Sequence, residues 1–179
     1  VIASGAQYRR LPIDNLINFE GRGIYYGATP MEAQLCQEQE VAIVGAGNSA
    51  GQGAVFLSRY ASKVHVLYRR PNIRDTMSEY LVRRLEEAPN IYLHPETEID
   101  ALHGSDCTDP ERDRLTAISV RNCSSGEVTK HPASFAFLFV GAAPFTKWLP
   151  ETLSCDGKGF LKTGPDLGNL DLVRAGWSL

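Results

Sequence analysis

A short apolar run, Val41–Val44, stops directly at Gly45, and Gly47 follows two residues later. An unbroken apolar run of this length is typical of a strand that is buried on both faces of a parallel sheet. From residue 48 to residue 61, small and apolar residues recur at helical spacing. The segment therefore predicts a strand, a tight glycine turn and a helix in succession. This order restricts the chain to α/β folds that are built on a parallel sheet.

The glycine turn carries the pattern Gly-x-Gly-x-x-Ala, which is weak by itself but indicates a dinucleotide site when it joins a strand to a helix. The first glycine permits the tight turn, the second lets the backbone approach a pyrophosphate, and the alanine keeps the helix close to the strand. The N–H groups at the helix start, aided by the helix dipole, would bind the anion. A tight turn without a ligand is the alternative interpretation. The residues assigned to the cofactor here are Gly45, Gly47, Asn48, Ser49 and Ala50.

The end of the second predicted strand, residues 63–67, indicates which dinucleotide the site prefers. A site for NAD carries an acidic residue there, about 20 residues after the glycine turn, to bind the ribose 2′-hydroxyl. Here Arg69 and Arg70 occupy that place, and Arg74 follows. Guanidinium groups suit a 2′-phosphate through charge-assisted, bidentate hydrogen bonds, so the sequence predicts NADP(H). A solvated strand end is the alternative, but it does not explain the missing acid.

Downstream of the arginines, the pattern predicts one further helix and two further strands of the same sheet. Thr76 and Glu79 have the spacing of a capping box, and the helix that they open is expected to run to about Ala88. A short strand is expected over residues 91–94. The unbroken apolar run 135–140 is expected to be a central strand.

The remaining segments complete the predicted fold class. A short helix is expected over residues 31–39, whereas residues 163–179 show no clear period. Three segments alternate apolar with polar residues and are expected to pair as an antiparallel meander: residues 97–102, 115–121 and 127–130. The predicted class is therefore α/β, a Rossmann-like parallel sheet with flanking helices and a three-stranded antiparallel meander.

Length and composition narrow the class of protein further. The 179 residues suit one domain, and the net charge of −3 argues against a dedicated nucleic-acid binder. No apolar run approaches the length of about 20 residues that a transmembrane helix needs. The four cysteines and four histidines are scattered, so no metal site is expected, and reduced cytoplasmic thiols are the default. The chain does not begin with Met, which suggests a fragment.

Several motifs together resemble the NADPH-binding domain of the thioredoxin reductase family. The glycine turn is followed by Tyr68-Arg69-Arg70-x-x-x-Arg74, which is similar to the family's H-R-R-x-x-x-R motif with Tyr68 in place of the histidine. Similar segments lie near both ends of the chain, and the resemblance therefore covers nearly all of it. They are residues 2–6, 137–144 and 156–161.

The resemblance implies one NADPH-binding domain over residues 1–179, with its core at about 24–145, excised from a larger flavoprotein. The implied cofactors are NADP(H) and, in the full-length parent, FAD. The implied partner is the FAD domain of the same parent chain, a homodimer is an option, and neither nucleic acid nor a membrane is expected. The resemblance adds Gly141, Ala143 and Pro144 to the cofactor site.

The chain departs from the family at two places. Members with disulfide chemistry carry C-x-x-C just before the glycine strand, whereas Gly27 and Pro30 stand there in this chain. Without a dithiol there is no thiol–disulfide exchange. Cys36 is the nearest thiol and is expected to be a helix cysteine rather than a redox group. Both FAD motifs of the family are also absent, so no catalytic residue is assigned.

The hypothesis is therefore an NADPH-binding domain of a thioredoxin reductase-like oxidoreductase, which donates hydride from NADPH to an FAD held outside this chain. The isolated chain is not expected to be active alone. One alternative is a ferredoxin-NADP reductase-like flavoprotein, which also lacks the dithiol. Another is a non-catalytic module that responds to NADP(H) or serves in protein interaction. A plain Rossmann dehydrogenase is disfavoured, because the sequence has no Tyr-x-x-x-Lys pair and no catalytic histidine in a recognisable setting.

Overall fold

The computed structural model describes residues 5–105 and 113–177. Its contacts divide the chain into two compact units. The larger unit is Arg10–Val140, and the smaller unit joins Val1–Arg9 with Gly141–Leu179. The glycine turn and the arginines lie in the larger unit.

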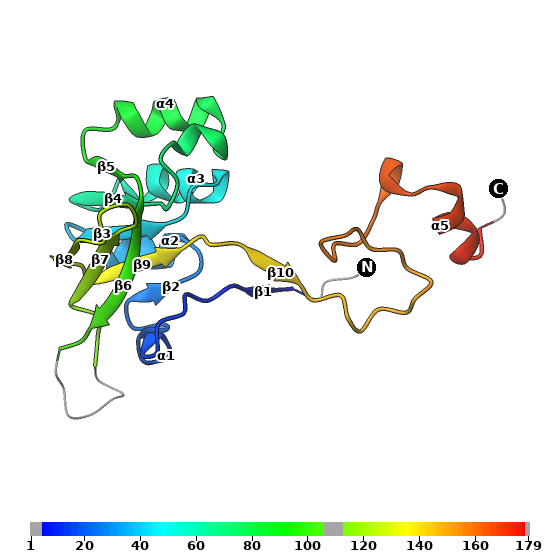
Figure 1. Ribbon diagram of the computed structural model, residues 1–179, viewed down its shortest axis with the longest axis horizontal. Helices are drawn as coiled ribbons and strands as arrows, with labels where there is room; N and C mark the ends of the chain where they lie inside the picture. Colours follow the sequence, from blue (N-terminus) through cyan, green and yellow to red (C-terminus); the bar gives the residue numbers. More distant parts are fainter. Residues whose placement is uncertain (1–4, 106–112, 178–179) are drawn as a thin grey trace. The chain divides into compact units, whose positions relative to one another are not determined.

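Five strands of the larger unit form a parallel sheet in the order β2-β9-β3-β4-β5 (Figure 1). Their bounds are Ile24–Tyr25 for β2, Phe135–Leu138 for β9, Glu40–Val44 for β3, Lys63–Leu67 for β4 and Ile91–His94 for β5. Strand β9 pairs with β2 on one side and with β3 on the other, so the prediction of a central strand is confirmed. Residues 41–44 are buried, as expected for a strand covered on both faces.

Helices cover one face of this sheet (Figure 1). They are α2 (Pro30–Leu35), α3 (Asn48–Leu57) and α4 (Glu79–Glu87). Each helix turns its apolar side to the sheet. In α4 the buried side chains are Leu81, Val82 and Leu85, which share one side of the helix. The helices and the sheet therefore share one hydrophobic core.

The antiparallel meander covers the opposite face of the sheet and encloses a second core, confirming that prediction. It consists of β6 (Thr97–His103), β7 (Ala117–Asn122) and β8 (Val128–Pro132). The short helix α1 (Leu16–Phe19) contributes its two buried residues to the same core. The larger unit thus has three layers: helices, parallel sheet and meander.

The structure corrects several predicted helix boundaries. The capping box over Thr76 and Glu79 was wrong: α4 begins after Ser78, and Thr76 ends a 3-10 turn, η1 (Ile73–Asp75). The Thr76 hydroxyl donates instead to the carbonyl oxygen of Ala46, 2.7 Å away. The helices predicted to reach residues 39 and 61 end at residues 35 and 57. Hydrogen bonds to a distant backbone carbonyl cannot be seen in local spacing, so the pattern of residues 76–79 pointed to the wrong partner.

A capping box does form at α2, where the sequence had not been assigned one. The Thr29 side chain accepts from the N–H of Met31, and the Glu32 carboxylate accepts from the N–H of Thr29 at 2.9 Å. Pro30 occupies the first helical position, where its missing N–H is not needed. The start of α2 is therefore fixed by local chemistry alone.

The smaller unit contains a two-stranded antiparallel sheet of β1 (Ala6–Tyr8) and β10 (Ala142–Pro144). Its later part holds the 3-10 turn η2 (Gly164–Asp166) and the helix α5 (Asn169–Arg174), in the segment that showed no clear period. Among the described residues, no helix is long and apolar enough to cross a membrane.

Candidate functional site

The glycine turn lies at the carboxyl end of β3, between the ends of β4 and β9. The N–H of Gly45 donates to the carbonyl of Leu67 at 3.0 Å, and the N–H of Phe139 donates to the carbonyl of Val44 at 2.8 Å. From β3 the chain continues to β4 on one side, while β9 lies on the other, so this is the point where the strand order reverses. Open α/β sheets bind ligands in the crevice at such a point.

Gly45 is required by the backbone itself. Its φ is +145°, a conformation that L side chains rarely adopt. A Cβ placed on it would lie 2.6 Å from the carbonyl oxygen of Phe139 and 3.3 Å from the Cβ of Ala50. The tight turn and the close approach of Ala50 are thus the conformations that the glycine pattern predicted.

Gly47 has an ordinary backbone conformation, with φ −91°, and is the N-cap of α3. A Cβ placed on it would meet no atom within 4 Å, so the space in front of it is open. No side chain caps the start of α3, which leaves the N–H groups of its first turn for another acceptor. Open space beside uncapped N–H donors at a helix start suits an anion.

Two further glycines, Gly51 and Gly53, were not singled out by the sequence analysis, yet they fix the position of α3. A Cβ on Gly51 would lie 2.7 Å from the sulfur of Met77, and one on Gly53 would lie 2.8 Å from the ring of Phe139. The unusual density of glycine over residues 45–53 was the available signal. These glycines let α3 pack against the residue that follows β9 and against the segment before α4.

The three predicted arginines lie just beyond β4, in two different electrostatic settings. Arg69 and Arg70 are exposed, and neither forms an ion pair within the described part of the chain. Arg74 donates to both carboxylate oxygens of Glu86 at 2.9 Å and to Glu79 at 3.2 Å. The hydrogen bonds to Glu86 chiefly raise the pKa of Arg74. Arg69 and Arg70 are therefore the cations that remain available to an added anion.

The structure brings together the glycine turn and the arginine segment, but the remaining candidates lie in the other unit. Gly141 has φ +94°, and its carbonyl accepts from the N–H of Arg9 at 3.0 Å. Ala143 and Pro144 belong to β10 and pair with β1. In the structure these three residues therefore have an evident role in the antiparallel pair of the smaller unit.

The positions that correspond to the family's dithiol hold no thiol. Pro30 is the first residue of α2, and Gly27 lies in the turn before it. Cys36 ends α2 and is fully buried, and this burial, with a smaller contribution from Glu32, raises the pKa of its thiol to about 12. A thiol in that state is not nucleophilic at neutral pH. Of the other cysteines, Cys123 and Cys155 are exposed, and Cys107 lies outside the described residues.

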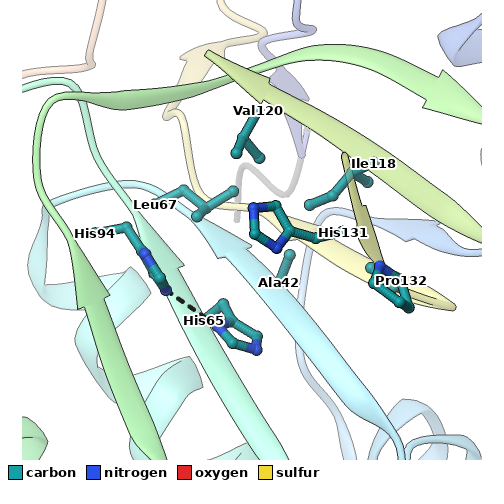
Figure 2. A pocket seen from close by; sticks show the side chains of 9 residues that line it. Ala42, His65, Leu67, His94, Ile118, Val120, His131 and Pro132 are labelled. Atoms are coloured by element: carbon teal, nitrogen blue, oxygen red, sulfur yellow. Dashed lines mark hydrogen bonds between the residues drawn. The ribbon is translucent and has the colours of Figure 1, made fainter. Parts of the chain in front are cut away.

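A separate pocket lies between the parallel sheet and the meander (Figure 2). The histidines are scattered along the sequence, but the fold brings His65, His94 and His131 to this pocket from β4, β5 and β8. The Nδ1 of His65 lies 3.0 Å from the Nε2 of His94. The Nε2 of His65 lies 3.4 Å from a carboxylate oxygen of Glu40. Within residues 5–105 and 113–177, no three His, Cys, Asp or Glu side chains lie close enough together to hold a metal ion.

Comparison with known proteins agrees with this fold. The family described as pyridine nucleotide-disulphide oxidoreductase matches residues 1–167. A thioredoxin reductase of Streptomyces coelicolor is 28% identical over 162 residues, which are 90% of this chain and 47% of that protein. The NADPH-dependent thioredoxin reductase 3 of Arabidopsis thaliana is 31% identical over 167 residues, covering 90% of this chain and 29% of that protein.

Solved structures give the same result. The thioredoxin reductase of Giardia duodenalis aligns with a TM-score of 0.74 and 27% identity, over 90% of this chain and 50% of that one. The thioredoxin reductase of Lactococcus lactis aligns with a TM-score of 0.74 and 23% identity, over the same shares, and at that identity the likeness shows the fold alone. The chain thus spans about half the length of these structures and of the Streptomyces protein.

Proposed function

The chain belongs to the pyridine nucleotide-disulphide oxidoreductase family and is a thioredoxin reductase-like domain of it, and from this membership we propose that it is the NADPH-binding part of a flavoprotein. When NADPH is bound, its nicotinamide supplies a hydride. The acceptor in this proposal is an FAD that is carried by another domain of the same parent chain.

One observation carries the proposal: the open, uncapped glycine turn and two arginines that form no ion pair with the described residues lie at the same edge of the parallel sheet. Gly45 donates its N–H to Leu67, and Arg69 follows Leu67 by two residues, so both segments start from paired strand ends. The open space at Gly47 admits a diphosphate, and the exposed arginines suit a phosphate on the ribose. The residues present therefore fit NADPH.

In this proposal the chain's own residues bind and orient the cofactor and carry out no proton transfer. The N–H groups of Asn48, Ser49 and Ala50 hold the diphosphate through the positive end of α3. Arg69 and Arg70 hold the 2′-phosphate. Arg74 is bound to Glu86 of α4 and supports the segment that joins the other two arginines to this helix. Gly141, Ala143 and Pro144 stay proposed cofactor residues on the resemblance alone.

The absence of a dithiol at Gly27 and Pro30 favours a second candidate for the class of the parent flavoprotein. Gly27 and Pro30 supply no thiol, and Cys36 is buried with a raised pKa. A ferredoxin-NADP reductase-like flavoprotein needs NADPH and FAD but no disulfide. Both candidates assign this chain the same task, which is to hold NADPH.

The proposed preference for NADPH is tested by calorimetric titration of the chain with NADPH and with NADH at moderate salt. Two charge-assisted hydrogen bonds of about 1.5–3 kcal/mol each give a preference of at least about tenfold. The variant with both Arg69→Ala and Arg70→Ala is expected to lose most of that preference while it keeps weak binding of both dinucleotides.

A matched control carries Arg59→Ala and Lys130→Ala, which removes two exposed cations away from the arginine segment. This control is expected to bind like the wild type. Equal affinities of the wild-type chain for NADPH and NADH would contradict the proposal, and so would an equal effect of the two double variants.

A further inference from the structure

The segment just before α4 is hydrogen-bonded to the glycine turn, although the two are about thirty residues apart in sequence. The hydroxyl of Thr76 donates to the carbonyl of Ala46 at 2.7 Å, and the N–H of Ser78 donates to the side-chain oxygen of Asn48 at 2.8 Å, each with a separation of 30 residues. Between them, Met77 packs against Gly51 of α3. The segment 76–78 is therefore held to the glycine turn by two hydrogen bonds and to α3 by the packing of Met77.

The bond from Thr76 determines the orientation of one particular peptide group. Ala46 and Gly47 share a planar trans peptide, in which the carbonyl of Ala46 and the N–H of Gly47 point in opposite directions. Because Thr76 holds the carbonyl on its own side, the N–H of Gly47 faces away from Thr76.

The Gly47 N–H is a donor without an acceptor in the described part of the chain. The residue itself borders open space, since a Cβ on it would meet nothing within 4 Å. A donor of this kind costs free energy if it is covered without a partner. An anion that approaches the turn would satisfy it.

We propose that Thr76 is a positioning residue of the diphosphate site: its hydroxyl fixes the Ala46–Gly47 peptide so that the Gly47 N–H faces the cofactor's diphosphate. The inference rests on the proposed function and adds a residue that lies outside the glycine and arginine motifs. Thr76 touches no part of the cofactor in this proposal and acts through the peptide that it holds.

A merely structural role for Thr76 makes a different prediction. If the hydroxyl only tied two loops together, its loss would lower the stability or loosen the arginine segment as well. If the hydroxyl positions the Gly47 N–H, its loss lowers the affinity for ligands that carry a diphosphate. The affinity for a ligand that does not reach the glycine turn then stays unchanged. Adenosine 2′-monophosphate is such a ligand, because its single phosphate is the one proposed to bind Arg69 and Arg70.

The experiment titrates the chain with NADPH, NADH and adenosine 2′-monophosphate. Thr76→Val keeps the shape of the side chain but removes its hydroxyl. This variant is expected to bind both dinucleotides about tenfold more weakly, which corresponds to the loss of one hydrogen bond to a charged group. The ratio of NADPH to NADH affinity and the affinity for adenosine 2′-monophosphate are expected to stay unchanged. Thr76→Ser, which restores the hydroxyl, is expected to bind like the wild type.

Thr116→Val is the matched control. The hydroxyl of Thr116 is also exposed and donates to a backbone carbonyl, that of Gly104 at 2.8 Å, but it lies at the meander. This variant is expected to bind all three ligands normally. If Thr76→Val does not fold, Thr76→Ala removes the same hydroxyl without placing a methyl group where the hydroxyl was, and it serves in its place.

Three outcomes would overturn the inference. Wild-type affinity for NADPH in Thr76→Val would show that the hydroxyl positions nothing that the cofactor uses. An equal loss for adenosine 2′-monophosphate would show that the hydroxyl only supports the loops. Failure of Thr76→Ser to recover binding would exclude the hydrogen bond as the cause. A wild-type chain that binds neither dinucleotide would instead overturn the proposed function, and this inference with it.

Discussion

At the scale of single residues, the two glycines of the turn serve different physical needs although the motif treats them alike. Gly45 has a positive φ, and a Cβ on it would clash with the Phe139 carbonyl, so any other residue at this position strains the fold. Gly47 has φ −91° and faces open space, so nothing in the fold requires it. Its absent side chain matters only for what approaches the turn.

Substitution at the two glycines should therefore separate stability from binding. Gly45→Ala is expected to lower the free energy of unfolding by about 1–3 kcal/mol from backbone strain, with a further loss from the clash with Phe139. Gly47→Val is expected to cost only about 1 kcal/mol as a poorer N-cap but to abolish NADPH binding. Urea unfolding and calorimetric titration measure the two effects. A Gly47→Val chain that binds NADPH like the wild type would show that the turn is not the site.

The cysteines also differ at this scale, because burial sets their reactivity. Cys36 is fully buried with a thiol pKa of about 12, whereas Cys123 and Cys155 are exposed. Brief treatment of the native chain with iodoacetamide at neutral pH is expected to modify Cys123 and Cys155 and to leave Cys36 intact. Peptide mass spectrometry reads the result, and the same treatment in urea is the control in which Cys36 should react. Modification of native Cys36 at the rate of the exposed thiols would contradict its assignment as a structural residue.

At the scale of elements, the meander and the parallel sheet meet at a group of histidines (Figure 2). Burial lowers the pKa of His65 and of His94. At His94 the neighbouring His65 lowers the pKa further, and His131 makes a smaller contribution in the same direction at both rings. Glu40 raises the pKa of His65 and so opposes the lowering, whereas Lys63 lowers it further. The ring of Tyr92 stacks on the His65 ring. Between these two layers of the fold, the pKa of His65 and the pKa of His94 therefore lie below the ordinary value of 6.5.

The pH dependence of stability follows from the direction of these shifts. The unfolded chain protonates both rings near the ordinary pKa of 6.5, whereas the folded chain protonates them only at lower pH. The unfolded state therefore binds more protons below about pH 6.5, so stability that is present above that pH is lost on acidification. Carboxylates with lowered pKa, such as Glu40, lose their contribution only below their ordinary value of 4.5.

We expect the Tm of the wild-type chain to fall between about pH 7.5 and about pH 5.5, by about 2–4 °C for each kcal/mol lost. A variant with His65→Gln and His94→Gln cannot take up these protons and should show a smaller fall over the same interval. His103→Gln, in β6 outside this group, is the control and should follow the wild type. Circular dichroism melting gives all three curves, and identical slopes for wild type and the double variant would refute the prediction.

At the scale of the whole molecule, the chain covers only part of the length of its relatives. It spans about half the length of relatives such as the Streptomyces thioredoxin reductase, and its smaller unit joins residues from both ends of the chain. The described residues include the glycine turn and the exposed arginines, but Gly27 and Pro30 stand at the positions of the family's dithiol. In our proposal the parent protein therefore accepts electrons from NADPH and does not pass them through a cysteine pair in this domain.

This absence gives a prediction for the full-length parent. We expect NADPH to reduce its flavin, while NADPH-dependent disulfide reduction stays negligible, because attack on a disulfide needs a thiolate and release of the mixed disulfide needs a second thiol. Flavin absorbance and a disulfide-reduction assay measure the two steps. The Cys36→Ser variant is expected to behave like the wild type. Disulfide turnover that disappears in this variant would make Cys36 a redox residue and sink the prediction.

Local sequence patterns did not indicate β1, α1, β2, β10 or α5, but they were enough to predict the strands over 41–44, 63–67, 91–94 and 135–140, the meander and the glycine turn. These depend on local periodicity and on glycine between a strand and a helix, and both are visible in neighbouring residues. The run 135–140 reads as a buried strand for the same reason, although β9 itself ends at residue 138. The strands over 63–67 and 91–94 lie where the pattern placed them.

Tertiary structure alone decided which distant groups meet. Local spacing assigned Thr76 to a helix cap, but in the fold its hydroxyl reaches Ala46, because a hydroxyl bonds the nearest free acceptor in space. Arg74 is taken up by Glu86, while Arg69 and Arg70 stay unpaired in the described chain. Three histidines that look scattered in sequence share one pocket, since β4 and β5 pair within the parallel sheet and the packing of the meander on that sheet adds His131 from β8. Such contacts depend on the positions of whole elements, and no local pattern encodes them.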